Sequence, residues 1–220
     1  MSEPGHLTRT RAGYDAIAEV CADMFRTEFD DAPYDRAVLA GFAESVRRDH
    51  PDARTLDVGC GHGVVTAFLA GHGLDVRGID LSAEMVGFAR RAHPGITFDV
   101  GEMSRLPVPD GDLAALVAWY SLIHVPAGDR PGVVAGFARA LRPGGYLALG
   151  FQAGTGIHRR DEAFGHAIEL EFHRLDPDDV AALLADNGFD VVLRLVRAPE
   201  ERSAAAQVPQ ACVVARRTAK

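Results

Sequence analysis

T-L-D-V-G-C-G-H-G, which occupies residues 55–63, gives the strongest indication of the fold. Its first four residues are typical of the end of a buried strand. Gly59, Gly61 and Gly63 then permit a tight turn whose backbone closely approaches whatever lies above it. The apolar run Val64–Ala70 predicts a helix, so the segment opens a nucleotide-binding α/β unit. Similar glycines also occur in loops that bind nothing, and the turn taken alone leaves both interpretations open.

Two further strand ends follow at the distances that such a unit requires. Gly78-Ile79-Asp80 ends a second strand and places a carboxylate about twenty residues after the turn, where this architecture holds ribose hydroxyls. Phe98-Asp99-Val100 ends a third strand, and Gly101-Glu102-Met103 comes directly after it. The carboxyl ends of parallel strands share one edge of the sheet. The sequence therefore predicts a ligand site at this edge.

Composition narrows the classes of protein and partner. The chain has 220 residues, 47% of them hydrophobic, which fits one α/β domain with a substantial core. The formal net charge of −8 disfavours a nucleic-acid partner, because a phosphate backbone requires a basic surface. No apolar run approaches the ~20 residues that cross a bilayer, and the N-terminus lacks a signal pattern. We therefore expect no membrane partner and a cytoplasmic location.

Cysteines and histidines give no sign of a metal site. The cysteines are few, odd in number and widely spaced, which indicates neither a disulfide framework nor zinc ligands. Cys60 lies between two glycines of the turn, where a small residue that fits is favoured over a functional thiol. Three histidines after the fifth expected strand match no ligand spacing. They are expected to be solvated, to pack, or to shape a substrate pocket. These histidines are His158, His166 and His173.

Strands and helices alternate regularly through the middle of the chain, which implies a parallel sheet with right-handed crossovers. Ser82 is the expected N-cap of the second helix, with Glu84 in its first turn. Arg142-Pro143-Gly144-Gly145 is expected to end the third helix. The expected strands are Arg54–Asp57, Asp75–Ile79, Ile96–Val100, Leu113–Ala118 and Tyr146–Phe151. The expected helices are Val64–Gly71, Ser82–Pro94 and Arg130–Leu141.

The segments on either side of this alternation have other roles. Helices around Tyr14–Val20 and Val38–Arg48 either cover the ligand edge as a lid or pack in an ordinary way. Later in the chain, Ile168–Phe172 alternates as a short strand, and Asp176-Pro177 starts a helix. Two final strands, Asp190–Val196 and Gln210–Arg216, complete the chain. We expect one domain: an N-terminal helical lid (1–50), a cofactor-binding core (51–151), a variable substrate segment (152–175), and a C-terminal helix and strand hairpin (176–220).

Five motifs in order, L-D-V-G-C-G-H-G, G-I-D-L-S, G-E-M-S-R-L-P-V-P-D-G, A-W-Y-S-L-I-H and L-R-P-G-G, resemble the class I S-adenosylmethionine-dependent methyltransferases. Within that superfamily the chain is similar to the small-molecule enzymes of the ubiquinone/menaquinone and natural-product group. The likeness covers roughly residues 14–216, and the ordered combination is specific although each motif alone is not. It implies a Rossmann-like α/β fold whose seven-stranded sheet is mostly parallel, with an antiparallel last strand and helices on both faces. Four residues depart from the common pattern: Cys21, His62, Glu102 and Met103.

The resemblance implies S-adenosylmethionine as cofactor and S-adenosylhomocysteine as its product. The backbone at Gly59, Cys60 and Gly61 would approach the amino-acid tail. Asp57 would help to hold the ammonium group of that tail, directly or through water. Asp80 would accept hydrogen bonds from both ribose hydroxyls, a task that suits the two oxygens of a carboxylate.

The adenine and the sulfonium require different partners. By resemblance, Leu81 and Met85 would pack near the adenine. Glu102 or the adjacent amide of Met103 would meet the adenine edge. The remaining expected cofactor contacts are Ala118, Trp119 and, closing the site from above, Tyr14.

Methyl transfer is an in-line displacement that needs a general base only when the nucleophile must lose a proton. His124 is the candidate base, because an imidazole exchanges protons near neutral pH. A helical turn after the fourth strand would place Tyr120 and His124 on one face, toward the cleft. A packing or orienting role for His124 stays open.

The resulting prediction is methyl transfer to a small organic acceptor by a monomer or homodimer. A nicotinamide-dependent oxidoreductase is an alternative, although the turn reads G-x-G-x-G rather than G-x-G-x-x-G. A non-catalytic cofactor-binding protein is a second alternative, because a fold does not prove an activity. An RNA or protein methyltransferase is disfavoured by the acidic balance of the chain.

Overall fold

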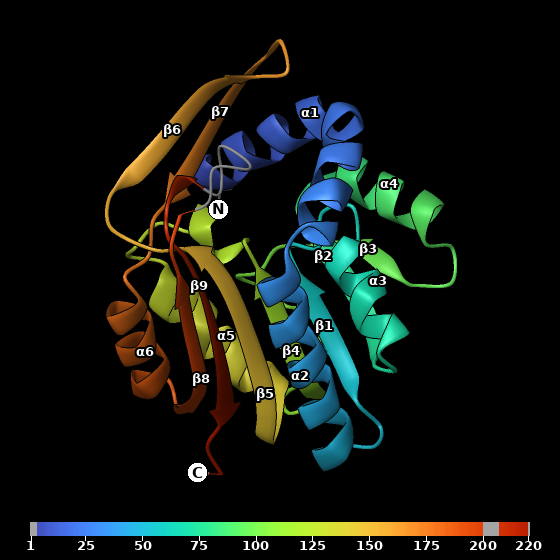
Figure 1. Ribbon diagram of the computed structural model, residues 1–220, viewed down its shortest axis with the longest axis vertical. Helices are drawn as coiled ribbons and strands as arrows, with labels where there is room; N and C mark the ends of the chain where they lie inside the picture. The colour runs from blue at the N-terminus through green and yellow to red at the C-terminus, as the bar shows by residue number, and fades with distance from the viewer. Residues whose placement is uncertain (1–3, 200–206, 220) are drawn as a thin grey trace.

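A computed structural model describes residues 4–199 and 207–219 and has a seven-stranded sheet at its centre (Figure 1). The strand order is β3-β2-β1-β4-β5-β9-β8. β1 to β5 pair in parallel, while β9 runs antiparallel to both β5 and β8. The predicted fold class is confirmed. The strands are β1 (Arg54–Val58), β2 (Asp75–Asp80), β3 (Phe98–Val100), β4 (Leu113–Trp119), β5 (Leu141–Gln152), β8 (Phe189–Arg197) and β9 (Gln210–Arg217).

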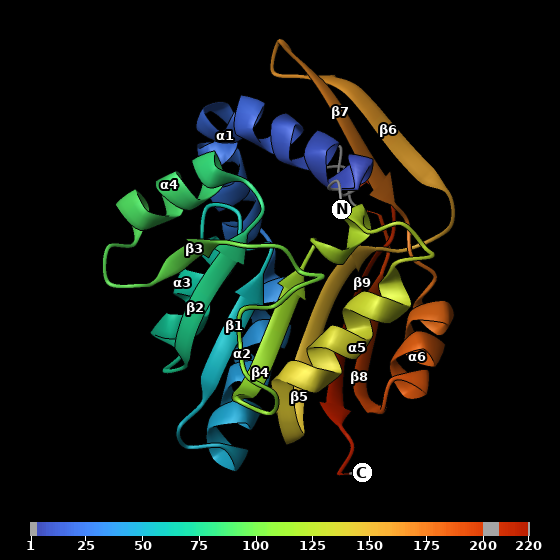
Figure 2. The same ribbon diagram turned by 180° about the vertical axis from the view of Figure 1, so that it is seen from behind.

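Helices cover both faces of this sheet. α2 and α3 lie on the face turned to the viewer in Figure 1, and α5 lies on the face seen in Figure 2. Successive strand residues point to opposite faces, so neighbours enter different cores. Leu116 packs with Phe137 of α5, whereas Val117 packs with Leu39 of α2. The helices are α1 (Gly5–Asp30), α2 (Pro33–Asp49), α3 (Val64–Gly71), α4 (Ala83–Ala92), the 3₁₀ turn η1 (Leu122–His124), α5 (Arg130–Ala140) and α6 (Pro177–Asp186).

The glycine turn between β1 and α3 has the predicted backbone. Gly59, Gly61 and Gly63 have φ angles of 74°, 52° and 79°, a region that side chains rarely allow. A Cβ atom at Gly59 would lie 2.3 Å from the Cβ of Ser121. At Gly61 the added atom would meet nothing within 4 Å, because that residue faces open space. The turn therefore packs tightly on one side and presents bare backbone on the other.

A hairpin of two strands, β6 (Ile157–Ala163) and β7 (His166–His173), stands beside α1 above the sheet (Figures 1 and 2). The sequence predicted only the core of β7, whose Ile168 and Leu170 point into a small core with α1. β6 was missed because most of its side chains are exposed and polar, so it has no apolar period. At Gly13 the absence of a side chain lets α1 approach Leu170 closely.

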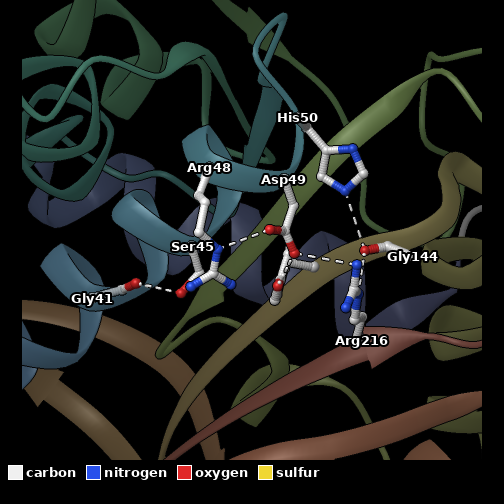
Figure 3. A network of polar contacts seen from close by, with 8 residues as sticks. Gly41, Ser45, Arg48, Asp49, His50, Gly144 and Arg216 are labelled. Carbon is white, nitrogen blue, oxygen red and sulfur yellow. Dashed lines mark hydrogen bonds and ion pairs between the residues drawn. The ribbon is translucent and has the colours of Figure 1, made fainter.

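The two N-terminal helices occupy different places. α1 lies across the carboxyl edge of the sheet, whereas α2 packs on a sheet face (Figure 1). Figure 3 shows the polar contacts between the C-terminal end of α2 and the strands β5 and β9. The carboxylate of Asp49 accepts hydrogen bonds from Arg48 (2.9 Å) and from the Tyr146 hydroxyl (2.7 Å) and pairs with Arg216 (3.2 Å). These contacts lower the pKa of Asp49 to about 2.

Most element boundaries lie within two residues of the prediction, but β5 begins earlier than expected. The helix stops before Arg142, as predicted, but the prediction that the fifth strand starts at Tyr146 is wrong. α5 ends at Ala140, and β5 starts at Leu141. The glycine pair is absorbed as a register shift, since Leu113 pairs with Leu141 but Ala115 pairs with Tyr146. Within residues 4–199 and 207–219, no helix combines the length and apolarity needed to cross a membrane.

Candidate active site

A cavity of about 330 Å³ lies at the carboxyl ends of β1, β2 and β4, beneath α1 and β7. It is formed at the edge where parallel sheets of this kind bind ligands. Most of the residues predicted for the site meet there. These are Tyr14, Gly59, Cys60, Gly61, Asp80, Leu81, Met85, Glu102, Met103, Trp119, Tyr120 and His124.

Two predicted cofactor residues lie behind the cavity wall instead. Asp57 is buried beneath the glycine turn, where its Oδ2 accepts a hydrogen bond from Thr66 Oγ1 at 2.7 Å. Burial raises the pKa of Asp57 to about 7. Ala118 is fully buried in the core that underlies the sheet. Both residues therefore support the turn and strand that carry the wall, and direct contact with a ligand stays a prediction.

The carboxylate of Asp80 is held by two backbone N–H groups. Its Oδ2 accepts from Gly61 at 2.8 Å, and its Oδ1 accepts from Ser82 at 2.9 Å. Burial raises the pKa of Asp80, while these two hydrogen bonds oppose the shift. A carboxylate has about four acceptor sites, so each oxygen keeps capacity for a ligand. β2 thus places in the cavity a carboxylate that can accept hydrogen bonds. This carboxylate is itself hydrogen-bonded to the glycine turn.

α1 is hydrogen-bonded to the two loops that follow β1 and β2. The Oδ1 of Asp15 accepts a hydrogen bond from Ser82 Oγ at 2.5 Å, and Ser82 is also the N-cap of α4. His62 Nε2 donates to the carbonyl of Ala18 at 2.8 Å. His62 is one of the departures from the family pattern, and in this protein it links the turn to α1. Two hydrogen bonds therefore connect α1, which covers the cavity, to the loops that form the cavity floor.

His124 has defined hydrogen-bond directions. Its Nδ1 lies 2.9 Å from the backbone carbonyl of Glu171 on β7, and its Nε2 lies 2.8 Å from the Tyr14 hydroxyl. A carbonyl only accepts, so Nδ1 carries the proton and Nε2 accepts from Tyr14. Burial lowers the pKa of His124 to about 4 and raises that of Tyr14, so both groups are neutral at pH 7. The lone pair on Nε2 is thus unprotonated, and it already accepts a hydrogen bond from the hydroxyl of Tyr14.

The α-helical turn that would bring Tyr120 and His124 onto one face is not formed. Tyr120 has a left-handed backbone (φ 53°), and η1 behind it is a 3₁₀ turn rather than an α-helix. The α-helical spacing used in the prediction therefore does not apply. Both side chains line the cavity, but the Tyr120 hydroxyl accepts a hydrogen bond from Arg197 at 3.4 Å. Strained backbone of this kind gathers at functional sites.

A buried ion pair completes the wall, and the sequence did not predict it. The carboxylate of Asp35, at the start of α2, meets Arg197 of β8 at 2.7 Å. Its second oxygen accepts a hydrogen bond from Trp119 Nε1 at 3.3 Å. The two residues are far apart in the chain and belong to no motif. Phe172 of β7 also reaches the cavity, and only the alternation of its strand was visible in the sequence. Among the described residues, no group of three metal-binding side chains is present.

Comparison with known proteins agrees with this geometry. A family model described as a methyltransferase domain matches residues 55–145. A methyltransferase of Synechocystis sp. is 31% identical over 151 residues, which make up 64% of this chain and 69% of that protein. The chain belongs to the class I S-adenosylmethionine-dependent methyltransferases. The methyltransferase interpretation of the five motifs is confirmed.

Other methyltransferases match shorter stretches or the fold alone. The demethylmenaquinone methyltransferase of Beutenbergia cavernae is 38% identical over 103 residues, 45% of this chain and 40% of that protein. This methyltransferase chain spans 36% to 42% of the length of the first three curated relatives. The complex of DhpI with S-adenosylhomocysteine superposes with a TM-score of 0.75 at 21% identity, over the full length of both chains. At that identity the likeness concerns the fold.

Proposed function

We propose that this methyltransferase binds S-adenosylmethionine and catalyses transfer of its methyl group to a small organic acceptor. One observation carries the proposal: a single cavity holds the positioned carboxylate of Asp80 and the neutral imidazole of His124. Family membership adds the type of reaction. The acceptor binds beneath α1 and β7, beside His124.

The residues present suit the cofactor. It supplies a methyl group activated by a sulfonium. The bare backbone at Gly61 leaves room for close approach of the amino-acid tail. Asp80 keeps acceptor capacity for ribose hydroxyls, and Glu102 or the amide of Met103 meets the adenine edge. Asp57 acts indirectly, by supporting the glycine turn beneath which it is buried.

The cover of the site contributes alignment. α1 and β7 enclose the cavity and exclude water, which favours in-line attack by a positioned acceptor. His124 takes up a proton when the nucleophile must lose one, because Nε2 carries a lone pair.

Family membership argues against a nicotinamide-dependent oxidoreductase, and turnover separates an enzyme from a non-catalytic cofactor-binding protein. The absence of nucleic-acid and membrane partners, a monomer or homodimer, and a cytoplasmic location remain predictions.

Titration calorimetry with S-adenosylhomocysteine tests the cofactor, with NADH in parallel. We expect one saturable site for the first ligand and none for the second. Asp80→Ala should weaken binding about 100-fold, because it removes a charged acceptor of two hydrogen bonds. Asp99→Ala is the matched control, since Asp99 is an exposed strand-end acid paired with Arg90. Unchanged affinity in Asp80→Ala would contradict the site assignment.

A further inference from the structure

The directions of the hydrogen bonds around His124 restrict access to its lone pair. Nδ1 donates to the Glu171 carbonyl, so only Nε2 can accept a proton. Nε2 already accepts the hydroxyl proton of Tyr14 at 2.8 Å. The oxygen of Tyr14 keeps lone pairs of its own, and the residue lines the cavity. A molecule in the cavity therefore reaches the imidazole through Tyr14 without displacing any contact.

The surroundings of this pair combine apolar side chains with charges of opposite sign: Asp80 and Arg160 shift the pKa of Tyr14 in opposite directions. The ring of Phe172 packs edge-on against His124, with 5.0 Å between ring centroids. Ile123 and Val125 line the same wall. Asp35, which also lines the cavity, is neutralised by its ion pair with Arg197. The side chain of Glu171 pairs with Arg159 on the hairpin. This end of the cavity suits an uncharged acceptor with a large apolar part.

We propose that the acceptor is a neutral alcohol or phenol, methylated at oxygen, and that Tyr14 is a catalytic residue that relays the hydroxyl proton to His124. This inference rests on the proposed function. The acceptor oxygen forms a bond to the methyl carbon as the carbon–sulfur bond breaks, and that electron pair stays on sulfur. The acceptor proton passes to the Tyr14 oxygen while the Tyr14 proton passes to Nε2. One positive charge enters the reaction on sulfur and one leaves on the imidazolium, so the buried site keeps its net charge.

The hydrogen-bonded pair of Tyr14 and His124 can remove a proton, which an oxygen nucleophile requires and an alkylamine does not. An alcohol or phenol acquires a methyl group and becomes a strongly acidic oxonium unless its proton leaves, so even a base of pKa about 4 receives that proton. A methylated alkylamine keeps its proton, with a pKa near that of lysine, ~10.4, and so needs no base. Proton and methyl transfer are therefore concerted, with the proton moving late. The relay therefore favours a hydroxyl acceptor over an alkylamine, and also over a thiol, because S–H is a weak hydrogen-bond donor to the Tyr14 oxygen.

The test uses three acceptors that share the naphthalene ring: 2-naphthol, the alkylamine 2-naphthylmethylamine and 2-naphthalenethiol. Each is incubated with S-adenosylmethionine and the full chain, and S-adenosylhomocysteine and the methylated product are quantified by chromatography with mass detection. We expect product from 2-naphthol alone. Tyr14→Phe and His124→Gln should each lower kcat by about 100-fold or more. The double variant should lose little further, because the two residues act as one unit.

Calorimetry with S-adenosylhomocysteine separates this inference from the proposed function. Tyr14→Phe keeps the aromatic ring that covers the cavity and should bind S-adenosylhomocysteine within about threefold of the unaltered protein. Tyr34→Phe changes an exposed tyrosine outside the cavity lining and should keep full turnover. Full turnover in Tyr14→Phe, methylation of the amine or thiol, or binding of the cofactor product without turnover of 2-naphthol would each overturn the relay and the hydroxyl class. Failure of the unaltered protein to bind S-adenosylhomocysteine would overturn the proposed function itself.

Discussion

His124 shows how burial changes the chemistry of one residue. A solvated imidazole is half protonated near pH 6.5, but in the cavity its pKa falls to about 4. Burial is the main cause and His173 adds to it, whereas the hydrogen bond to the Glu171 carbonyl opposes it. The residue type was readable from the sequence. Its tautomer and basicity depend on Tyr14 and Glu171, which come from other elements.

This shift predicts a pH-dependent stability. Between pH ~6.5 and about 4 the unfolded chain binds a proton on His124 that the folded chain does not. The free energy of unfolding should therefore fall as the pH decreases through this window, by about 3 kcal/mol from His124, and this contribution should not change below it. Urea unfolding at pH 7 and pH 4.5 should show a smaller loss in His124→Asn. The exposed His158→Asn should behave like the unaltered protein, and equal losses in all three would contradict the assignment.

At the scale of elements, α1 is the cover of the cavity and its position depends on a few polar contacts. Asp15 holds α1 to the first turn of α4 through Ser82 Oγ. The neighbouring Tyr14 is thereby placed over His124. Apolar packing also holds α1, through the buried side chains of Ile17 and Ala18 and the close approach of Gly13 to Leu170.

Removing this attachment should weaken cofactor binding. In Asp15→Ala we expect about tenfold weaker binding of S-adenosylhomocysteine, because a loosened α1 encloses the ligand less often and must be ordered on binding. Cleavage within α1 by a low concentration of trypsin should also become faster. Glu19→Ala, an exposed acid on the same helix, is the control. Equal affinity and equal cleavage in both variants would show that apolar packing alone holds the helix.

Elements were predictable to the extent that a periodic apolar face exists. α3, α4 and the buried strands have such a face, so their positions followed from the sequence. The hairpin strand β6 does not, because it stands away from the main core with polar side chains on both of its faces. α1 was recognised near Tyr14, but its full extent, Gly5–Asp30, was not.

At the scale of the whole molecule, the pair Asp35–Arg197 joins α2 to the edge strand β8 in the wall of the cavity. Trp119 of β4 contributes a hydrogen bond to the same carboxylate. A charge that is buried in this way costs free energy unless its partner is present. The pair therefore secures the relative positions of three distant parts of the fold.

Breaking the pair should destabilise the protein strongly. Arg197→Met leaves the carboxylate of Asp35 buried without this cation, and we expect a loss of about 3–5 kcal/mol in the free energy of unfolding. The double variant Asp35→Asn/Arg197→Met should recover part of it. Arg194→Met provides the matched control on β8, because its pair with Asp178 is exposed and is expected to contribute less than ~1 kcal/mol. Urea unfolding measures all three, and similar values for Arg197→Met and Arg194→Met would contradict this assignment.

Local spacing was sufficient for the framework of this methyltransferase. The glycine turn, the alternation of strands and helices and the strand-end carboxylate of Asp80 follow from periodicity and from steric limits on the backbone, which act between residues close in the chain. The partners in the site came from tertiary packing. Tyr14 and His124 are 110 residues apart, and Asp35 and Arg197 are 162 apart. No period or spacing encodes such contacts, because they depend on how α1 and β7 are placed over the edge of the sheet and on how the edge strand β8 is placed beside α2.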